Sequence, residues 1–316
     1  MSEHKEKSKI IFAGTSEFGI PTFEKLISNP DFKIVAALTQ PDRRKGRGQK
    51  LGAGPIKEIA FRHKVPLLQP FELKKSGELE KLFNKDIDFL VVVSYGLLIP
   101  KIILDSIRFC INVHASVLPK LRGASPIQHA IMNGDEFSGI SIMQITEELD
   151  AGPIYCSETV RLKSNETYGS LSSKLARMGS EKLIETIYKI KREQIEPQPQ
   201  DNSGASYAAK INKKNKEINW TDPATYIERQ VRALSPSPGA ISQINGLKIK
   251  IYEVRIEKNM LPLKPGEWSI DPNNKRIIVG TSTESISIVS IQRSGGKIML
   301  AKDFINGFDN KKFNKE

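Results

Sequence analysis

An amide, an imidazole and a hydroxyl alternate along one short segment of the chain. Asn112, His114 and Ser116 follow the apolar Cys110 and Ile111, a pattern typical of the end of a buried strand. Alternate residues of a strand point to the same face, so the three polar side chains share one face if the strand continues.

A carboxylate that would complete this group lies in the turn at residues 149–152, before another predicted strand. An amide can hold an oxyanion, a histidine can move a proton, and a carboxylate can orient the histidine. A lone strand histidine is more often structural, but these partners favour chemistry. We therefore predict that Asn112, His114 and Asp150 are catalytic residues for acyl transfer to an amine.

Patterns of buried strands alternate with helical patterns through the first two thirds of the chain. Strands are predicted at 9–15, 34–39, 66–69, 88–94, 109–114, 140–145 and 154–160, and helices at 18–28, 56–63, 79–83, 127–132 and 168–190. Apolar strands alternating with helices are typical of an open, mostly parallel sheet covered on both faces. The sequence therefore predicts an α/β domain, with its site at the carboxyl ends of the strands.

The pattern changes after a polar, proline-containing stretch. Beyond it come a predicted helix at 224–234 and short strands at 240–244, 247–256, 276–280 and 286–292. Short alternating strands separated by turns fit a small antiparallel barrel like an OB-fold. We expect an α/β catalytic domain over 1–195, a linker over 196–208 and an OB-like C-terminal domain over 209–316.

The chain is basic, with a net charge of +12. Residues 205–316 carry 19 Lys and Arg against 11 Asp and Glu, or +8, whereas residues 1–204 carry 29 against 25, or +4. Residues 41–50 add five cations after a predicted strand. A solvated loop and a generally basic proteome are the plainer explanations, but the location favours a polyanionic partner such as a nucleic acid.

Several protein classes are disfavoured by composition. The longest apolar run, residues 89–93, is far shorter than a membrane span, and the polar N-terminus does not fit a secretion or mitochondrial signal. Cys110 and Cys156 form neither a disulfide framework nor a metal-ligand pattern. The turn at 14–19 lacks the second glycine of a dinucleotide site, since Ser16 replaces it. We expect a cytoplasmic protein without a metal or a membrane segment.

Together these residues resemble the folate-dependent formyltransferases, and in particular the methionyl-tRNA formyltransferase branch. The matching motifs run in order at 11–15, 39–43, 46–48, 93–96, 111–114, 121–123, 126–128, 142–144 and 149–152. The Asn-x-His and Leu-Asp-x-Gly pair is shared by all these enzymes, whereas the cation-rich loop resembles the tRNA-acceptor loop of this branch. Ala115, Val117 and Ser237 depart from the usual pattern without removing a catalytic group.

The resemblance implies a Rossmann-like domain followed by an OB-like barrel. It also implies a monomer that transfers the formyl group of 10-formyltetrahydrofolate to the α-amino group of methionyl initiator tRNA. The folate is expected at two segments, which comprise Tyr95, Gly96, Leu97, Leu98, Ser116, Val117, Leu118 and Pro119. The tRNA is expected at six cations, which are Arg43, Arg44, Lys45, Arg47, Lys50 and Arg122.

Other activities stay open at this point. A sugar-nucleotide amine N-formyltransferase would have the same catalytic residues, but no reason for the cation-rich loop or so basic a C-terminal domain. A glycinamide ribonucleotide formyltransferase should lack the C-terminal domain, and a folate-hydrolysing relative should continue into a dehydrogenase. An RNA-binding protein with a silent α/β domain would have no reason to keep Asn112, His114 and Asp150 together.

Overall fold

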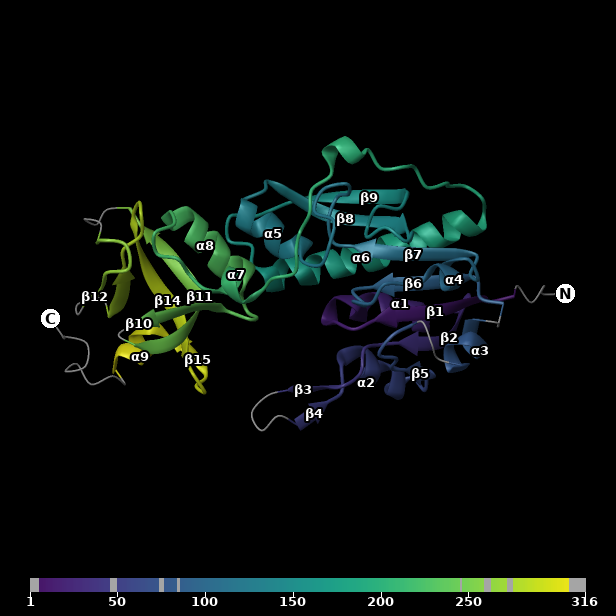
Figure 1. Ribbon diagram of the computed structural model, residues 1–316, viewed down its shortest axis with the longest axis horizontal. Helices are drawn as coiled ribbons and strands as arrows, with labels where there is room; N and C mark the ends of the chain where they lie inside the picture. Colours follow the sequence, from purple (N-terminus) through teal and green to yellow (C-terminus); the bar gives the residue numbers. More distant parts are fainter. Residues whose placement is uncertain are drawn as a thin grey trace. The chain divides into compact units, whose positions relative to one another are not determined.

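The computed structural model describes residues 6–45, 50–73, 77–83, 86–244, 246–258, 263–271 and 275–306. Its chain forms two compact units (Figure 1). The first contains Met1–Pro126, Ser138–Val160 and Ser172–Ala208, and the second contains Ile127–Phe137, Arg161–Leu171 and Ala209–Glu316. The chain thus passes from one unit to the other at several points, so the boundary is not a single linker.

A seven-stranded sheet in the order β5-β2-β1-β6-β7-β8-β9 organises the first unit. Its parallel strands are β1 (Ser8–Gly14), β2 (Phe32–Leu38), β5 (Leu67–Leu68), β6 (Phe89–Val93) and β7 (Phe109–His114). β8 (Phe137–Gln144) runs antiparallel to β7, and β9 (Ile154–Arg161) closes the order. The predicted mostly parallel, Rossmann-like sheet is confirmed.

Helices cover both faces of this sheet because alternate strand residues point in opposite directions. Phe12 of β1 stacks on Phe23 of α1 (Ile20–Ser28), with ring centroids 4.5 Å apart. Its neighbour Ile11 belongs to the core cluster that includes residues of α3 (Gly77–Phe83) and α4 (Lys101–Leu104). The remaining helical segments that begin in this part of the chain are η1 (Glu17–Gly19), α2 (Pro55–Arg62), α5 (Pro126–Asn133), α6 (Tyr168–Lys191) and η2 (Asn202–Gly204).

The register of the central strands positions the loops that matter for function. Val92 of β6 pairs with Asn112 of β7, so the segments that leave these strands start side by side. On one face, α6 approaches β7 closely, because a Cβ at Gly179 would lie 2.6 Å from Val113 Cγ1. Val113 therefore packs under the helix, which leaves Asn112 and His114 on the opposite face of the strand.

A small hairpin lies where the sequence predicts a cation-rich loop. β3 (Arg43–Lys45) and β4 (Lys50–Gly52) pair antiparallel, and residues 46–49 between them lie outside the described part of the chain. The prediction of an irregular loop was incomplete, because such short polar strands have none of the apolar alternation from which strands are recognised.

The second unit is built on a six-stranded antiparallel sheet in the order β10-β11-β14-β13-β12, with β15 paired to β14. The strands are β10 (Ala240–Ile244), β11 (Leu247–Glu257), β12 (Trp268–Asp271), β13 (Arg276–Val279), β14 (Ser285–Arg293) and β15 (Ile298–Leu300). Helix α8 (Ala224–Ala233) contacts β11, α9 (Ala301–Asn306) contacts β14, and α7 (Lys213–Lys216) precedes both. This sheet confirms the expected antiparallel domain and is consistent with a small barrel.

Two segments that precede residue 172 are built into this second unit. Gly169 N donates to Ser235 O at 3.0 Å, and Arg232 Nη1 donates to Glu166 O at 2.7 Å. His129 Nε2 lies 3.0 Å from Ala209 O. The segments 127–137 and 161–171 are therefore bonded to residues that follow 208.

Within the described residues, no helix is both long enough and apolar enough to cross a membrane.

Candidate active site

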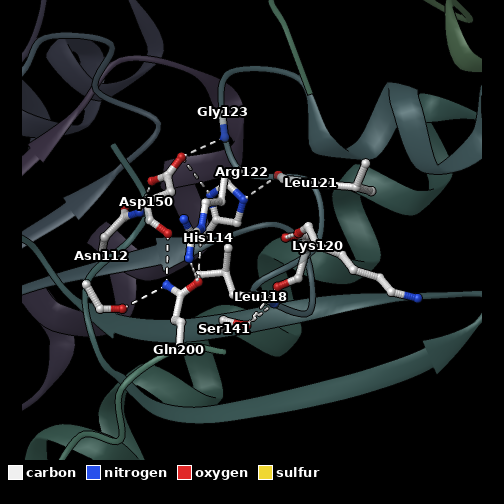
Figure 2. Close-up of polar contacts among 12 residues, drawn as sticks. Asn112, His114, Leu118, Lys120, Leu121, Arg122, Gly123, Ser141, Asp150 and Gln200 are labelled. Atoms are coloured by element: carbon white, nitrogen blue, oxygen red, sulfur yellow. Dashed lines mark hydrogen bonds and ion pairs between the residues drawn. The ribbon is translucent and has the colours of Figure 1, made fainter. Parts of the chain in front are cut away.

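The carboxylate of Asp150 lies next to both Asn112 and His114 (Figure 2). Asn112 Nδ2 donates to Asp150 Oδ1 at 3.5 Å, and His114 Nδ1 lies 3.6 Å from Asp150 Oδ2. The amide and the imidazole come from alternate positions at the end of β7, whereas the carboxylate comes from the turn between β8 and β9. The structure thus brings the three predicted catalytic residues together.

Asp150 is held in an unusual backbone conformation. Its φ is 51°, in the left-handed region that aspartate tolerates better than most residues. Gly123 N donates to Asp150 Oδ2 at 2.8 Å, and the Asp150 side chain is 12% exposed. The carboxylate is therefore fixed in place and shielded from most solvent.

The hydrogen bonds of His114 define its tautomer. His114 Nε2 lies 3.0 Å from Leu121 O, and because a carbonyl oxygen only accepts, Nε2 must carry the hydrogen. In the neutral ring the free lone pair is then on Nδ1, which faces Asp150.

A second layer of contacts supports the Asp150 turn. Gln200 Nε2 donates to Asp150 O at 2.9 Å and to Gly152 O at 2.8 Å. Arg122 donates to Gln200 Oε1 from Nε at 3.1 Å and from Nη2 at 2.8 Å, and from Nη2 to Asn202 Oδ1 at 2.6 Å. Figure 2 shows Gln200 between Arg122 and the turn. Within this layer Arg122 is only 2% exposed, Gln200 is half-buried and Asn202 is exposed.

Gly152 allows the turn to lie close to β8. A Cβ at this position would be 2.0 Å from Gln144 O, and Gln144 N donates to Pro153 O at 2.8 Å. No side chain fits at residue 152 without moving one of these backbones. The glycine of the Leu-Asp-Ala-Gly segment is therefore required by packing.

Comparison with known proteins connects this geometry to a family. Residues 7–187 match the family described as formyl transferase, and residues 210–309 match its C-terminal domain. The chain is 40% identical over 304 residues to the methionyl-tRNA formyltransferase of Coxiella burnetii, which covers 96% of both proteins. It is also 40% identical over 301 residues to that of Pseudoalteromonas translucida, covering 95% of this chain and 94% of the relative.

The chain belongs to the methionyl-tRNA formyltransferase family. A solved structure supports the same fold. The N-formyltransferase from Helicobacter canadensis, in complex with folinic acid and dTDP-3-aminofucose, superposes with a TM-score of 0.67 at 19% identity, covering 89% of this chain and 98% of that one.

The first folate-binding segment predicted from the family resemblance follows β6. Tyr95 is buried, and its carbonyl accepts from Thr15 Oγ1 at 2.9 Å and Gln40 Nε2 at 3.0 Å. Gly96 has a φ of 81° and is exposed, as is Leu98, while Leu97 is half-buried. The Tyr95 side chain is thus buried and its carbonyl is bonded within the protein, whereas Gly96 and Leu98 are exposed.

The second predicted folate segment, residues 116–119, leaves β7 and turns sharply. Because β7 ends at His114, Ser116 is not in the strand, and its hydroxyl donates to Lys120 O at 2.6 Å. Leu118 is buried, and its N–H donates to Ser141 Oγ at 3.0 Å, while Val117 and Pro119 are half-buried. Ser116 therefore stabilises the turn instead of sharing a face with His114.

The cations predicted to bind tRNA fall into two groups. Arg43, Arg44, Lys45 and Lys50 lie in the β3–β4 hairpin, where Arg43 is exposed, and Arg47 lies outside the described residues. Arg122, predicted for the same role, is only 2% exposed. Its guanidinium is buried against Gln200 and Asn202, where a large anionic substrate has no access.

The hairpin is anchored at its base by a polar cluster. Lys57 Nζ donates to Asp42 Oδ2 at 2.6 Å and to Gln69 Oε1 at 2.9 Å. Gln69 Nε2 donates in turn to Asp42 Oδ1 at 2.9 Å and to Gln40 O at 3.0 Å. Lys57 is 17% exposed and Asp42 26%, so solvent screens this ion pair only in part.

In the ranges that the structure describes, no group of three or more His, Cys, Asp or Glu residues is arranged to hold a metal ion.

Two residues of the site were missed from the sequence, Gly123 and Gln200. Gly123 lies in the motif at 121–123, but it acts through its backbone N–H, a role that its residue type does not indicate. Gln200 falls in the stretch predicted to be a linker, where a glutamine among prolines and polar residues has no distinguishing pattern. That stretch is bonded to the first unit, since Gln198 and Ile154 exchange two backbone hydrogen bonds of 2.8 Å.

Proposed function

We propose that this chain transfers the formyl group of 10-formyltetrahydrofolate to the α-amino group of methionyl initiator tRNA, for translation initiation. The proposal depends on the contacts that Asp150, from the turn between β8 and β9, makes with Asn112 and His114 at the end of β7, in a chain of this family. The folate supplies an activated one-carbon group, and the chain supplies the donors and acceptors around the reacting carbon.

Attack by the amine on the formyl carbon places negative charge on the formyl oxygen. Asn112 Nδ2 carries two hydrogens, and one of them is directed at Asp150 Oδ1. The second is available to the oxyanion, because an amide nitrogen can donate in two directions. Such a donor stabilises the transition state more than the ground state.

The attacking amine must lose a proton as the new bond forms. An α-amino group has a pKa near ~7.7, so a substantial fraction is neutral at physiological pH. His114 Nδ1 is the ring atom with a free lone pair, and Asp150 Oδ2 lies 3.6 Å from it. This pair takes the proton from the amine and returns it to the departing nitrogen.

The folate is assigned to the edge beside this cluster. Residues 96–98 leave β6 next to β7, and Leu98 is 70% exposed. An exposed leucine two residues from an exposed glycine suits an aromatic ring that needs an apolar contact and backbone hydrogen bonds on its edge. Residues 96–98 therefore fit a folate. The family resemblance adds Ser116–Pro119 as the second segment that would contact it.

The tRNA is assigned to the basic surfaces of the chain. The +8 charge of residues 205–316 suits the phosphate backbone, and the β3–β4 hairpin with Arg47 suits the acceptor end. We assign catalysis to 1–195 and tRNA binding to 209–316, in a cytoplasmic monomer.

The decisive experiment is formyl transfer from 10-formyltetrahydrofolate, with charged initiator Met-tRNA, free methionine and a 4-amino sugar nucleotide as parallel acceptors. Formylation of the tRNA alone is expected. Transfer to the sugar nucleotide alone would retain the chemistry at Asn112, His114 and Asp150, but would overturn the assignment of the basic surfaces.

A further inference from the structure

We propose that Gln200 is a positioning residue that holds the Asp150 turn in its active conformation, an inference that rests on the proposed function. The Gln200 amide donates to the carbonyls of Asp150 and Gly152, at 2.9 and 2.8 Å. A primary amide has two N–H groups, so this turn receives the whole donor capacity of the side chain.

Arg122 sets the orientation of that amide. A guanidinium only donates, so Gln200 Oε1 must face Arg122 Nε and Nη2, at 3.1 and 2.8 Å. The NH₂ group is thereby directed at the turn. Asn202 Oδ1 accepts from Arg122 Nη2 at 2.6 Å, and Glu148 Oε1 lies 4.0 Å from Nη1, which compensates the burial of the charge.

The Asp150 turn requires this support. A non-glycine residue with a φ of 51° carries a conformational cost, on the order of 1 kcal/mol. Asn112 and His114 lie 3.5 and 3.6 Å from the carboxylate, distances too long to impose the conformation. The short contacts are instead those from Gln200 to the backbone and from Gly123 N to the carboxylate.

Residues 200–208 also position the loop that carries the Gly123 N–H. Arg122 N donates to Ser206 O at 2.8 Å, and Ala208 N donates to Arg122 O at 2.7 Å. Residues 200–208 therefore hold the Asp150 turn from its backbone and hold the loop that binds its carboxylate. A misplaced carboxylate costs turnover because the reacting groups lose their alignment.

Two near-isosteric substitutions separate this role from simple packing. Gln200→Glu keeps the oxygen that accepts from Arg122, but it replaces the NH₂ donor with an oxygen that repels both carbonyls. Gln200→Met removes the donor and the acceptor. We expect both variants to lower kcat by roughly 10- to 100-fold, with the KM of both substrates within about threefold of wild type. The control is Gln198→Glu, at an exposed side chain two residues earlier, which should leave kcat and the KM of each substrate unchanged.

A second measurement is independent of activity. The Gly123 amide proton donates to a carboxylate, so its NMR resonance should move upfield in Gln200→Glu as that bond weakens. Wild-type kcat in Gln200→Glu, with or without a loss in Gln200→Met, would show that the donor is dispensable and would overturn the inference. An unmoved Gly123 resonance would overturn it as well. A wild-type protein that does not formylate Met-tRNA would instead contradict the proposed function, and the Gly123 resonance would still test the positioning.

Discussion

At the residue scale, the role proposed for Asn112 depends on the negative charge that develops on the formyl oxygen during the reaction. Its amide bonds Asp150 in the resting protein and has a second hydrogen for the formyl oxygen. We expect Asn112→Ala to lower kcat by ~10²–10³-fold with little change in KM, because the donor acts mainly in the transition state. Steady-state kinetics with both substrates would measure this.

Asn133→Ala is the matched control, since Asn133 is exposed at the end of α5. Turnover of Asn112→Ala within a few-fold of wild type would remove Asn112 from the oxyanion site.

Cys110 allows a prediction about pH at the residue scale. Burial raises the pKa of the Cys110 thiol to about 12, far above its value of ~8.5 in an unfolded chain. The neutral thiol is thus favoured by folding, so its contribution to stability is complete below about pH 8.5 and is lost as the pH rises toward 12. At a mildly alkaline pH, Cys110 should resist alkylation by iodoacetamide and Cys156, which is half-buried, should react first.

Mass spectrometry of the labelled peptides, with and without denaturant, would measure both rates. Equal labelling of the two cysteines in the folded protein would contradict the assigned burial of Cys110.

At the scale of elements, the contact between the Asp150 turn and β8 limits what residue 152 can be. A Cβ at Gly152 would lie 2.0 Å from Gln144 O, so one of the two backbones must move. We expect Gly152→Ala to lower the free energy of unfolding by about 1–3 kcal/mol and to reduce kcat through displacement of Asp150. Thermal denaturation and kinetics would show both effects.

Gly77→Ala is the control, since Gly77 begins α3 and a Cβ there would meet nothing within 4 Å. An unchanged melting temperature in Gly152→Ala would refute the close approach.

Loss of the contacts that anchor the β3–β4 hairpin should change the kinetics toward one substrate only. Lys57→Met removes the cation that bonds Asp42 and Gln69 at the base of the hairpin. Loss of a partly buried pair worth about 1 kcal/mol should raise the KM for Met-tRNA roughly fivefold. The KM for the folate should not change, and equal effects on both substrates would show that the hairpin does not act on the tRNA.

Strands buried on both faces are among those that sequence reasoning located correctly. The run at 89–93 forms β6 with five buried residues, since strands covered on both faces are continuously apolar. The short strands β12 and β15 were missed because none of their residues is buried, so they form no apolar run, whereas β13, also of four residues, has three buried residues. Likewise, the burial of Arg122 could not be predicted, because a charged residue suggests a surface position and its partners Gln200 and Asn202 lie 78 and 80 residues later in the chain.

For the whole molecule, charge predicts how the two substrates respond to salt. The +8 excess of residues 205–316 is assigned to phosphates of the tRNA, whose condensed counterions are released on binding. Raising monovalent salt from about 50 to about 200 mM should raise the KM for Met-tRNA roughly ten- to 100-fold, if three or so phosphates are contacted. The KM for the folate should change less than about twofold. A flat salt response for the tRNA would reject the phosphate assignment.

The interleaved division of the chain also constrains how such a protein can be recombined. Residues 127–137 and 161–171 are bonded to partners beyond residue 208, including Ser235 and Arg232. A single recombination point near residue 208 would therefore combine a C-terminal segment from a relative with residues 127–137 and 161–171 of this chain, which bond the native C-terminal segment. Relatives can exchange this module intact only if three separate stretches of the gene are inherited together.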